Sequence, residues 1–247
     1  MKFIVNDDYE ALSIHAANDL IEATRSSKNP LVCTASGDSP AGSYKKIVEK
    51  VQKKQLDVSD WLFVGLDEWV GMNGSDEGSC RYHLDQQLFC PLQIAEEKIC
   101  FFDGKAKDLE EECQRVENFI QKHNGINVAI LGLGMNGHVG MNEPGTARTI
   151  RSHAADLHST TQQVGQKYFR KEQELRQGIT LGLATLMEAK HLMLLINGKH
   201  KAEITKRVFE EKISEELPAS LLRGHPSFSV YLEPASAQLM RLQLQKS

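Results

Sequence analysis

The chain has 247 residues, of which 40% are hydrophobic, so it can bury a substantial core, and we expect a single domain over residues 1–247. Its formal net charge of −4 argues against a broad nucleic-acid-binding face, which needs clustered basic residues. No apolar run is long enough for a signal peptide or a membrane span, and the five cysteines include no C-x-x-C pair. We therefore expect a cytoplasmic protein without nucleic-acid or membrane partners, whose cysteines are reduced, buried thiols.

The N-terminal part of the chain is predicted to form helix, strand and helix. Apolar residues recur every three to four positions from Tyr9, which predicts an amphipathic helix ending near Ser26–Pro30. Leu31–Thr34 is predicted as a strand, and the small polar turn at residues 35–40 leads into a second amphipathic helix. Backbone N–H groups at the start of a helix favour a bound phosphate. The turn can equally be a plain helix cap made by its aspartate or its second serine.

Two carboxylates follow the next predicted strand. Trp61–Leu66 is an apolar run that leads directly into Asp67 and Glu68. Because side chains alternate along an extended chain, at most one of the two carboxylates is expected to face a given ligand. A solvated acidic turn is the plainer alternative. A helix, a short strand and a further helix are then predicted at Cys80–Phe89, Ile99–Phe102 and Leu109–Ile120. This alternation of strands and helices predicts parallel strands with right-handed crossovers.

The centre of the sequence pattern is an apolar strand followed by a glycine-rich loop. Val128–Leu131 is typical of a strand buried on both faces, and Asn136, His138 and Glu143 follow within a few residues. Open α/β sheets bind ligands just beyond the carboxyl ends of their strands. The loop therefore predicts a functional site, with a solvated histidine in a flexible loop as the alternative.

The same loop matches the dinucleotide-binding pattern G-x-G-x-x-G at residues 132–137. That fingerprint requires a helix to open at its third glycine, so that the helix N-terminus faces the pyrophosphate. Gly140 and Pro144 fall where this helix would run. A single match without its helix is weak, so we do not favour dinucleotide binding.

The C-terminal part continues the alternation. Thr149–Leu157 shows no clear period, whereas Thr160–Phe169 is predicted as a helix carrying Lys167. Two strands and the helix between them are predicted at His191–Ile196, Phe228–Leu232 and Ala202–Phe209, with a terminal helix after the last strand. Lys199 and Lys201 at the start of the middle helix oppose its dipole, so a bound anion would stabilise them. Solvated lysines are the alternative.

Five motifs in this order resemble the glucosamine-6-phosphate deaminase/isomerase family, whose relatives include the 6-phosphogluconolactonases. They are Ser36-Gly-Asp-Ser-Pro40, Leu66-Asp-Glu-Trp69, Gly137-His-Val-Gly-Met-Asn-Glu-Pro144, Asn197-Gly-Lys-His-Lys-Ala202, and His225-Pro with Glu233-Pro. The Asn-Glu-Pro continuation resembles the deaminase branch. The resemblance implies a modified Rossmann-like α/β fold, with a mostly parallel central sheet flanked by helices. It also implies conversion of an amino-sugar phosphate to a ketose phosphate with loss of ammonia. No cofactor or metal is implied, and a homo-oligomer is compatible with the family.

The resemblance also implies roles for individual residues. Asp67 would shuttle a proton between C2 and C1 of the sugar, and His138, oriented by Glu143, would assist opening of the sugar ring. The positions that match the family's phosphate-binding residues are Ser36, Gly37, Ser39, Lys167 and Lys201. Lys167 stands where many members have arginine, and a lysine offers a point charge without the bidentate fork.

Asn136 departs from the family pattern, because deaminases typically carry an aspartate beside the histidine. An amide can hydrogen-bond an imidazole but brings no net charge, so Glu143 is expected to be the main acidic partner of His138. The departure resembles galactosamine-6-phosphate-type members and favours that sugar as substrate. The basic residues of the family's allosteric pocket are not matched around His153 and Ala155, so we expect little allosteric control.

Two other functions remain open from the sequence. One is a lactonase that would use His138 to hydrolyse a sugar lactone. The other is a non-catalytic phosphosugar sensor, like the effector domains of some transcription regulators. The sensor is less favoured, because no helix-turn-helix segment fits before Leu31 and the acid/base residues are present.

Overall fold

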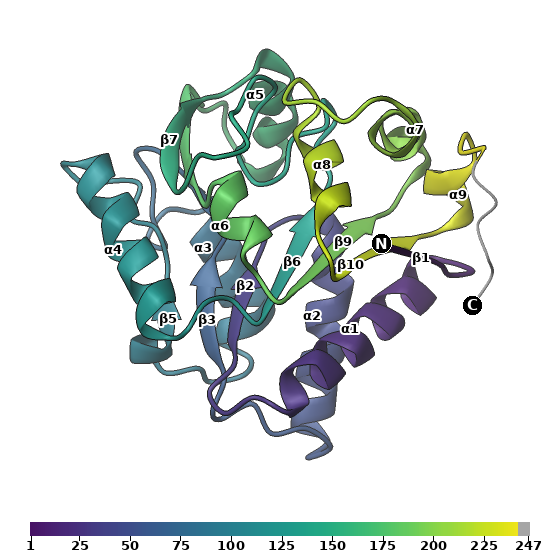
Figure 1. The fold of residues 1–247 in the computed structure, drawn as a ribbon. Helices are drawn as coiled ribbons and strands as arrows, with labels where there is room; N and C mark the ends of the chain where they lie inside the picture. The colour runs from purple at the N-terminus through teal and green to yellow at the C-terminus, as the bar shows by residue number, and fades with distance from the viewer. Residues whose placement is uncertain (242–247) are drawn as a thin grey trace.

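The computed structural model of the chain describes residues 1–241 and is built around a seven-stranded sheet (Figure 1). Its strand order is β1-β10-β9-β6-β2-β3-β5, and every neighbouring pair in it is parallel. The strands are β1 Lys2–Val5, β2 Leu31–Thr34, β3 Leu62–Gly65, β5 Ile99–Cys100, β6 Val128–Gly132, β9 His191–Ile196 and β10 Phe228–Leu232. The parallel sheet expected from the strand–helix alternation is confirmed, with β1 as a strand that the sequence analysis did not identify.

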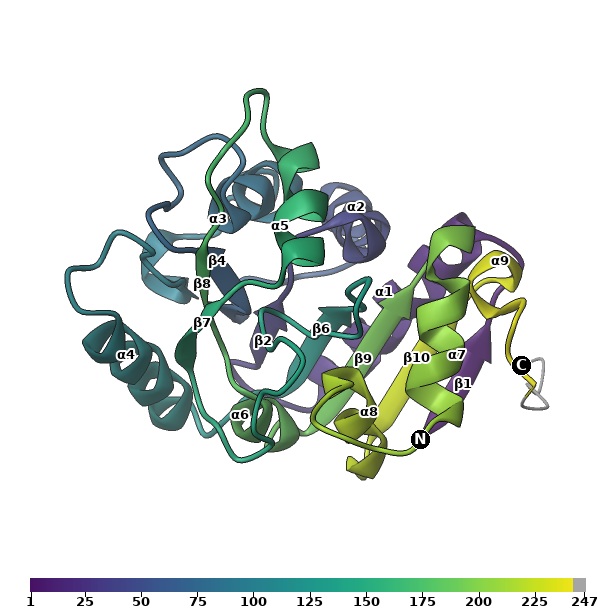
Figure 2. The same ribbon diagram turned by 90° about the horizontal axis from the view of Figure 1, so that it is seen from above.

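Helices cover both faces of this sheet (Figures 1 and 2). One face carries α1 Tyr9–Arg25, α2 Asp38–Gln52 and α3 Cys80–Leu84, and the other carries α4 Leu109–Lys122, α6 Leu183–Met187, α7 Ala202–Glu210 and α8 Pro218–Leu221. In β6, Val128 and Ile130 pack towards the first group, whereas Ala129 and Leu131 pack towards the second. This alternation explains why the buried strands are continuous apolar runs.

A second, smaller sheet lies beside the carboxyl edge of the first. Its order is β4-β8-β7, and both pairings are antiparallel. The strands are β4 Asp67–Trp69, β7 His153–Asp156 and β8 Gln177–Thr180. Because β4 begins two residues after β3 ends, the chain passes from one sheet directly into the other at Leu66. β7 was not predicted from the sequence, because it is a short edge strand with alternating partial exposure and contains two alanines.

Several predicted elements differ in detail. The helix expected over Thr160–Phe169 is α5 Ser159–Gly165 followed by a 3₁₀ turn, η3 Gln166–Tyr168, and the one over Cys80–Phe89 changes from α to π geometry after Leu84. The terminal helix is the four-residue α9 Pro234–Ala237. Four cysteines are buried as expected, but Cys90 is exposed because it lies in the turn that follows the π segment.

No helix within residues 1–241 combines the length and apolar character needed to cross a membrane. The single domain and the cytoplasmic location stay predictions.

Candidate active site

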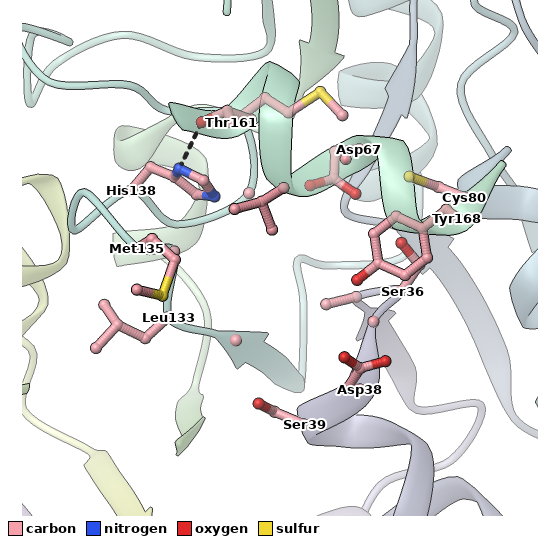
Figure 3. Close-up of a pocket in the computed structure, with 18 of the residues that line it drawn as sticks. Ser36, Asp38, Ser39, Asp67, Cys80, Leu133, Met135, His138, Thr161 and Tyr168 are labelled. Carbon is pink, nitrogen blue, oxygen red and sulfur yellow. Dashed lines mark hydrogen bonds between the residues drawn. The ribbon is translucent and has the colours of Figure 1, made fainter. Parts of the chain in front are cut away.

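A cavity of about 590 Å³ opens at the carboxyl ends of the central strands (Figure 3). Its walls come from the segments that follow β2, β3, β6 and β9, together with α5 and η3, and include residues 35–40, Asp67, Gly132–Met135, Asn197 and Lys167. This is the edge at which open α/β sheets bind ligands. The cavity therefore joins segments that are far apart in the sequence but end at one side of the sheet.

All five residues matched to phosphate-binding positions line one end of this cavity: Ser36, Gly37, Ser39, Lys167 and Lys201. The 15-residue helix α2 begins here with Gly37 as its N-cap, at a φ of 122° that favours glycine. A Cβ at this position would also lie 3.3 Å from the Tyr168 hydroxyl. No side chain caps α2 within the described part of the chain, so the plain-cap interpretation of the turn is wrong. Free N–H groups and the helix dipole remain available to an anion.

The two lysines at this end are held by different partners. The Nζ atom of Lys167 lies 2.5 Å from the Oδ2 atom of Asp38, and both residues line the cavity. The Nζ atom of Lys201 donates to the carbonyl oxygen of Leu133 at 2.6 Å. Burial, together with the positive charge of Lys167, lowers the pKa of Lys201 to about 8, although Asp38 opposes the shift. An anion placed between the lysines would stabilise the charged form of Lys201 and so offset the effects of burial and of Lys167. Lys199 is exposed and lies outside the cavity lining.

The carboxylates of Asp67 and Glu68 point in different directions, as alternation predicted. Asp67 lines the cavity, whereas Glu68 is fully buried and accepts backbone N–H groups of Trp69, Cys80 and Arg81 at 2.8, 2.8 and 2.9 Å. Glu68 thereby fixes the start of α3, and the solvated-turn alternative is wrong. Burial raises the pKa of Asp67 to about 6, against the opposing effects of the Cys80 thiol and of His138.

His138 lies across the cavity from Asp67, and its ring packs against Gly134 (Figure 3). A Cβ on Gly134 would approach the ring to within 2.3 Å, so only glycine permits this arrangement. The Nδ1 atom of His138 lies 3.1 Å from the Thr161 hydroxyl and 3.6 Å from Glu143 Oε2. Since the side chain of His138 is only 18% exposed, the solvated-histidine alternative is wrong.

The hydrogen bonds of Asn136 within residues 1–241 go to Glu143 and to the backbone of His138, not to the imidazole ring. Its side-chain amide donates to Glu143 Oε2 at 2.7 Å, and its side-chain oxygen accepts the backbone N–H of His138 at 3.2 Å. Burial alone would raise the pKa of Glu143, but interactions with His138, Thr161 and Asn136 outweigh it, so the net shift is downwards. Glu143 is therefore held ionised behind the histidine, and neither Asn136 nor Glu143 lines the cavity.

The dinucleotide fingerprint lacks its helix. Residues 133–145 form turns and a short bridge between Val139 and Asn142. Asn142 is buried, and its amide donates to the backbone oxygens of Val139 and Leu181, so it holds the loop together.

The lining residues that were not identified as site residues from the sequence include Cys80, Thr161, Tyr168 and Asn197. Thr161 and Tyr168 are seven residues apart, which is about two turns of a helix. In the helix predicted over Thr160–Phe169, this spacing places both residues on the same face. Asn197 directly follows β9, and it lies 2.6 Å from the Ser39 hydroxyl. The rule that selected Asp67 at a strand end applies equally to Asn197.

The arrangement brings a carboxylate and an imidazole to one cavity whose far end can hold an anion. Such a site can move protons on a small phosphorylated ligand. Within residues 1–241, no three or more His, Cys, Asp or Glu side chains gather so as to hold a metal ion.

Comparisons with known proteins agree with this architecture. The family model described as glucosamine-6-phosphate isomerases/6-phosphogluconolactonase matches residues 7–230. A glucosamine-6-phosphate deaminase of Shouchella clausii is 35% identical over 240 residues, which cover 97% of each chain. The solved structure of a monomeric glucosamine-6-phosphate deaminase superposes with a TM-score of 0.93 at 31% identity, covering 97% of this chain and 100% of that one. The 6-phosphogluconolactonase from Trypanosoma brucei shares the fold, with a TM-score of 0.74 at 17% identity and 96% and 97% coverage. The chain therefore belongs to the glucosamine-6-phosphate isomerase/6-phosphogluconolactonase family.

Proposed function

We propose that the protein is an amino-sugar phosphate deaminase, which converts glucosamine-6-phosphate or galactosamine-6-phosphate, with water, to the ketose 6-phosphate and ammonia. The observation that carries this proposal is the pair Asp67 and His138 on opposite sides of a cavity with an anion-binding end. The relative of Shouchella clausii and the superposed monomeric structure are both named as glucosamine-6-phosphate deaminases, which supports it.

In this proposal His138 opens the sugar ring. Its free nitrogen takes the proton of the O1 hydroxyl, and a proton is returned to the ring oxygen as the C1–O5 bond breaks. Glu143, held ionised by Asn136, stabilises the transient positive charge on the imidazole.

Asp67 then moves the proton that converts the aldose into a ketose derivative. Its carboxylate takes the proton from C2 and delivers it to C1, while the carbonyl oxygen O1 gains a proton and the amino group at C2 loses one, which leaves a hydroxyl at C1 and an imine at C2. Water adds to this carbon and ammonia leaves, so that the ketose is formed. A pKa of about 6 keeps Asp67 ionised at neutral pH while making it a stronger base than an exposed aspartate.

The phosphate is proposed to lie at the start of α2. Ser36, Gly37 and Ser39 offer hydroxyls and N–H groups there, and Lys167 and Lys201 supply positive charge. Binding would require Lys167 to exchange Asp38 for the phosphate, or to bridge both.

The preference for galactosamine-6-phosphate is the more specific part of the proposal. It rests on Asn136, which lies behind Glu143 and outside the cavity lining. A preference for one epimer would therefore act through the position of His138 and Glu143 rather than through direct contact of Asn136 with the sugar.

The direct test is incubation of the purified protein with glucosamine-6-phosphate, galactosamine-6-phosphate and 6-phosphogluconolactone, with assays for ammonia, ketose and acid. Ammonia and ketose in equal amounts from an amino sugar are expected. Asp67→Asn should reduce turnover at least about 100-fold, abolish solvent-deuterium exchange at C2, and leave phosphosugar binding nearly intact. Acid release from the lactone alone would instead identify a lactonase. Binding without turnover of any of the three would identify a sensor.

A further inference from the structure

One short segment contributes to both ends of the cavity. The helix α5 and the turn η3, which together run from Ser159 to Tyr168, form a wall beside the strand ends (Figure 3). Lys167 lies at the anion-binding end of this wall, whereas Thr161 lies beside His138. The acid/base roles proposed for Asp67 and His138 do not use this contact of Thr161.

Thr161 is the closer of two groups beside the Nδ1 atom of His138. Its hydroxyl oxygen lies 3.1 Å from that nitrogen, within hydrogen-bond distance, whereas Glu143 Oε2 lies 3.6 Å away. Thr161 is 6% exposed, so water does not readily replace it. The threonine is therefore the nearer hydrogen-bond partner of the imidazole, and the glutamate is the charged group beside the same nitrogen.

The hydrogen-bond donors around Glu143 indicate which group donates in the contact between Thr161 and His138. An ionised carboxylate only accepts hydrogen bonds, and Glu143 Oε2 already receives the Asn136 amide. Glu143 Oε1 is buried and has no hydrogen-bond partner within residues 1–241. A threonine hydroxyl can accept one hydrogen bond while donating another. The Thr161 hydroxyl is among the groups that stabilise the ionised Glu143, which fits donation towards this carboxylate.

We propose, on the basis of the function proposed above, that Thr161 is a positioning residue that sets the tautomer of His138. Its hydroxyl accepts the Nδ1–H of the ring and donates its own hydrogen to the Glu143 carboxylate. The proton of the neutral imidazole is thereby kept on Nδ1. The other nitrogen, Nε2, keeps its lone pair and faces the space between His138 and Asp67, where it can take the sugar hydroxyl proton.

The test compares Thr161→Val, which keeps the branched shape without the hydroxyl, with Thr161→Ser, which restores the hydroxyl. Thr24→Val is the matched control, because Thr24 is 3% exposed and its hydroxyl donates to carbonyls of its own helix α1. The tautomer is read by ¹⁵N NMR of histidine-labelled protein without ligand, and the His138 signals are assigned by their loss in His138→Gln. This measurement does not depend on turnover.

We expect wild type, Thr161→Ser and Thr24→Val to show a protonated Nδ1 and an unprotonated Nε2, and Thr161→Val to shift towards the other tautomer. For the amino-sugar phosphate, Thr161→Val should lower kcat about tenfold or more with little change in KM, and Thr161→Ser should recover most of it. An unchanged tautomer in Thr161→Val overturns the proposal. If the tautomer shifts but wild type deaminates neither amino sugar, the proposed function fails while the role of Thr161 stands.

Discussion

Burial of Asp67 has a cost in stability that a single substitution removes. The pKa of this carboxyl is raised by burial from 3.8 to about 6, that is, by about two pH units. At about 1.4 kcal/mol per unit, the ionised carboxylate destabilises the folded state by up to about 3 kcal/mol. Because the folded-state pKa is raised, this cost is absent below pH 3.8, about half present at pH 5, and complete above pH 6. Asp67→Asn should therefore stabilise the fold increasingly as the pH rises, while inactivating the proposed enzyme.

The measurement is urea unfolding of both proteins at pH 5, 6, 7 and 8. The gain in unfolding free energy should grow by about 1.4 kcal/mol between pH 5 and pH 8. Asp60→Asn, an exposed aspartate that precedes β3 at the opposite edge of the sheet, controls for the loss of one negative charge from an acidic protein. If Asp67→Asn is destabilising, or its effect does not vary with pH, the reasoning about burial is refuted.

Lys201, Asn136 and Glu68 can each be tested by one substitution. The KM for the phosphosugar should rise above about pH 8, where Lys201 loses its proton. Lys201→Met should raise KM and remove this pH dependence, and steady-state kinetics from pH 6.5 to 9 in which the variant keeps the wild-type pH dependence would contradict the assignment. Asn136→Asp should replace the amide donor to Glu143 by a second carboxylate and so raise the pKa of Glu143. The acidic limb of the pH–kcat/KM profile should then move to higher pH, and superimposable profiles of the two proteins would rule out this effect of residue 136. Glu68→Gln removes a buried charge, since burial raises the pKa of Glu68 to about 7, but an amide cannot accept all three backbone N–H groups. The amide hydrogens of Cys80 and Arg81 should therefore exchange faster with solvent in Glu68→Gln than in the exposed-site variant Glu97→Gln, and equal exchange in the two variants would disprove the anchoring role.

The sequence by itself determined the layered fold, because strands buried on both faces must be continuous apolar runs. Val128–Leu131 and His191–Ile196 were recognisable for this reason, and the helices between strands by their apolar period. The strands β7 and β8 lack that signal. They are short members of a small antiparallel sheet whose pairing with β4 depends on how distant segments meet.

The sequence also determined which polar residues stand at strand ends, and with the family resemblance it selected Asp67, His138 and the phosphate-binding positions, which the fold brings to one cavity. Only the tertiary structure decided what these side chains touch. The hydrogen bond between Thr161 and His138 spans 23 residues, and the side-chain amide of Asn136 donates to Glu143 rather than to the ring. Such partners depend on the direction of a loop and on the placement of α5 across the sheet edge. Local sequence patterns encode neither, because both arise from packing between segments that are distant in the chain.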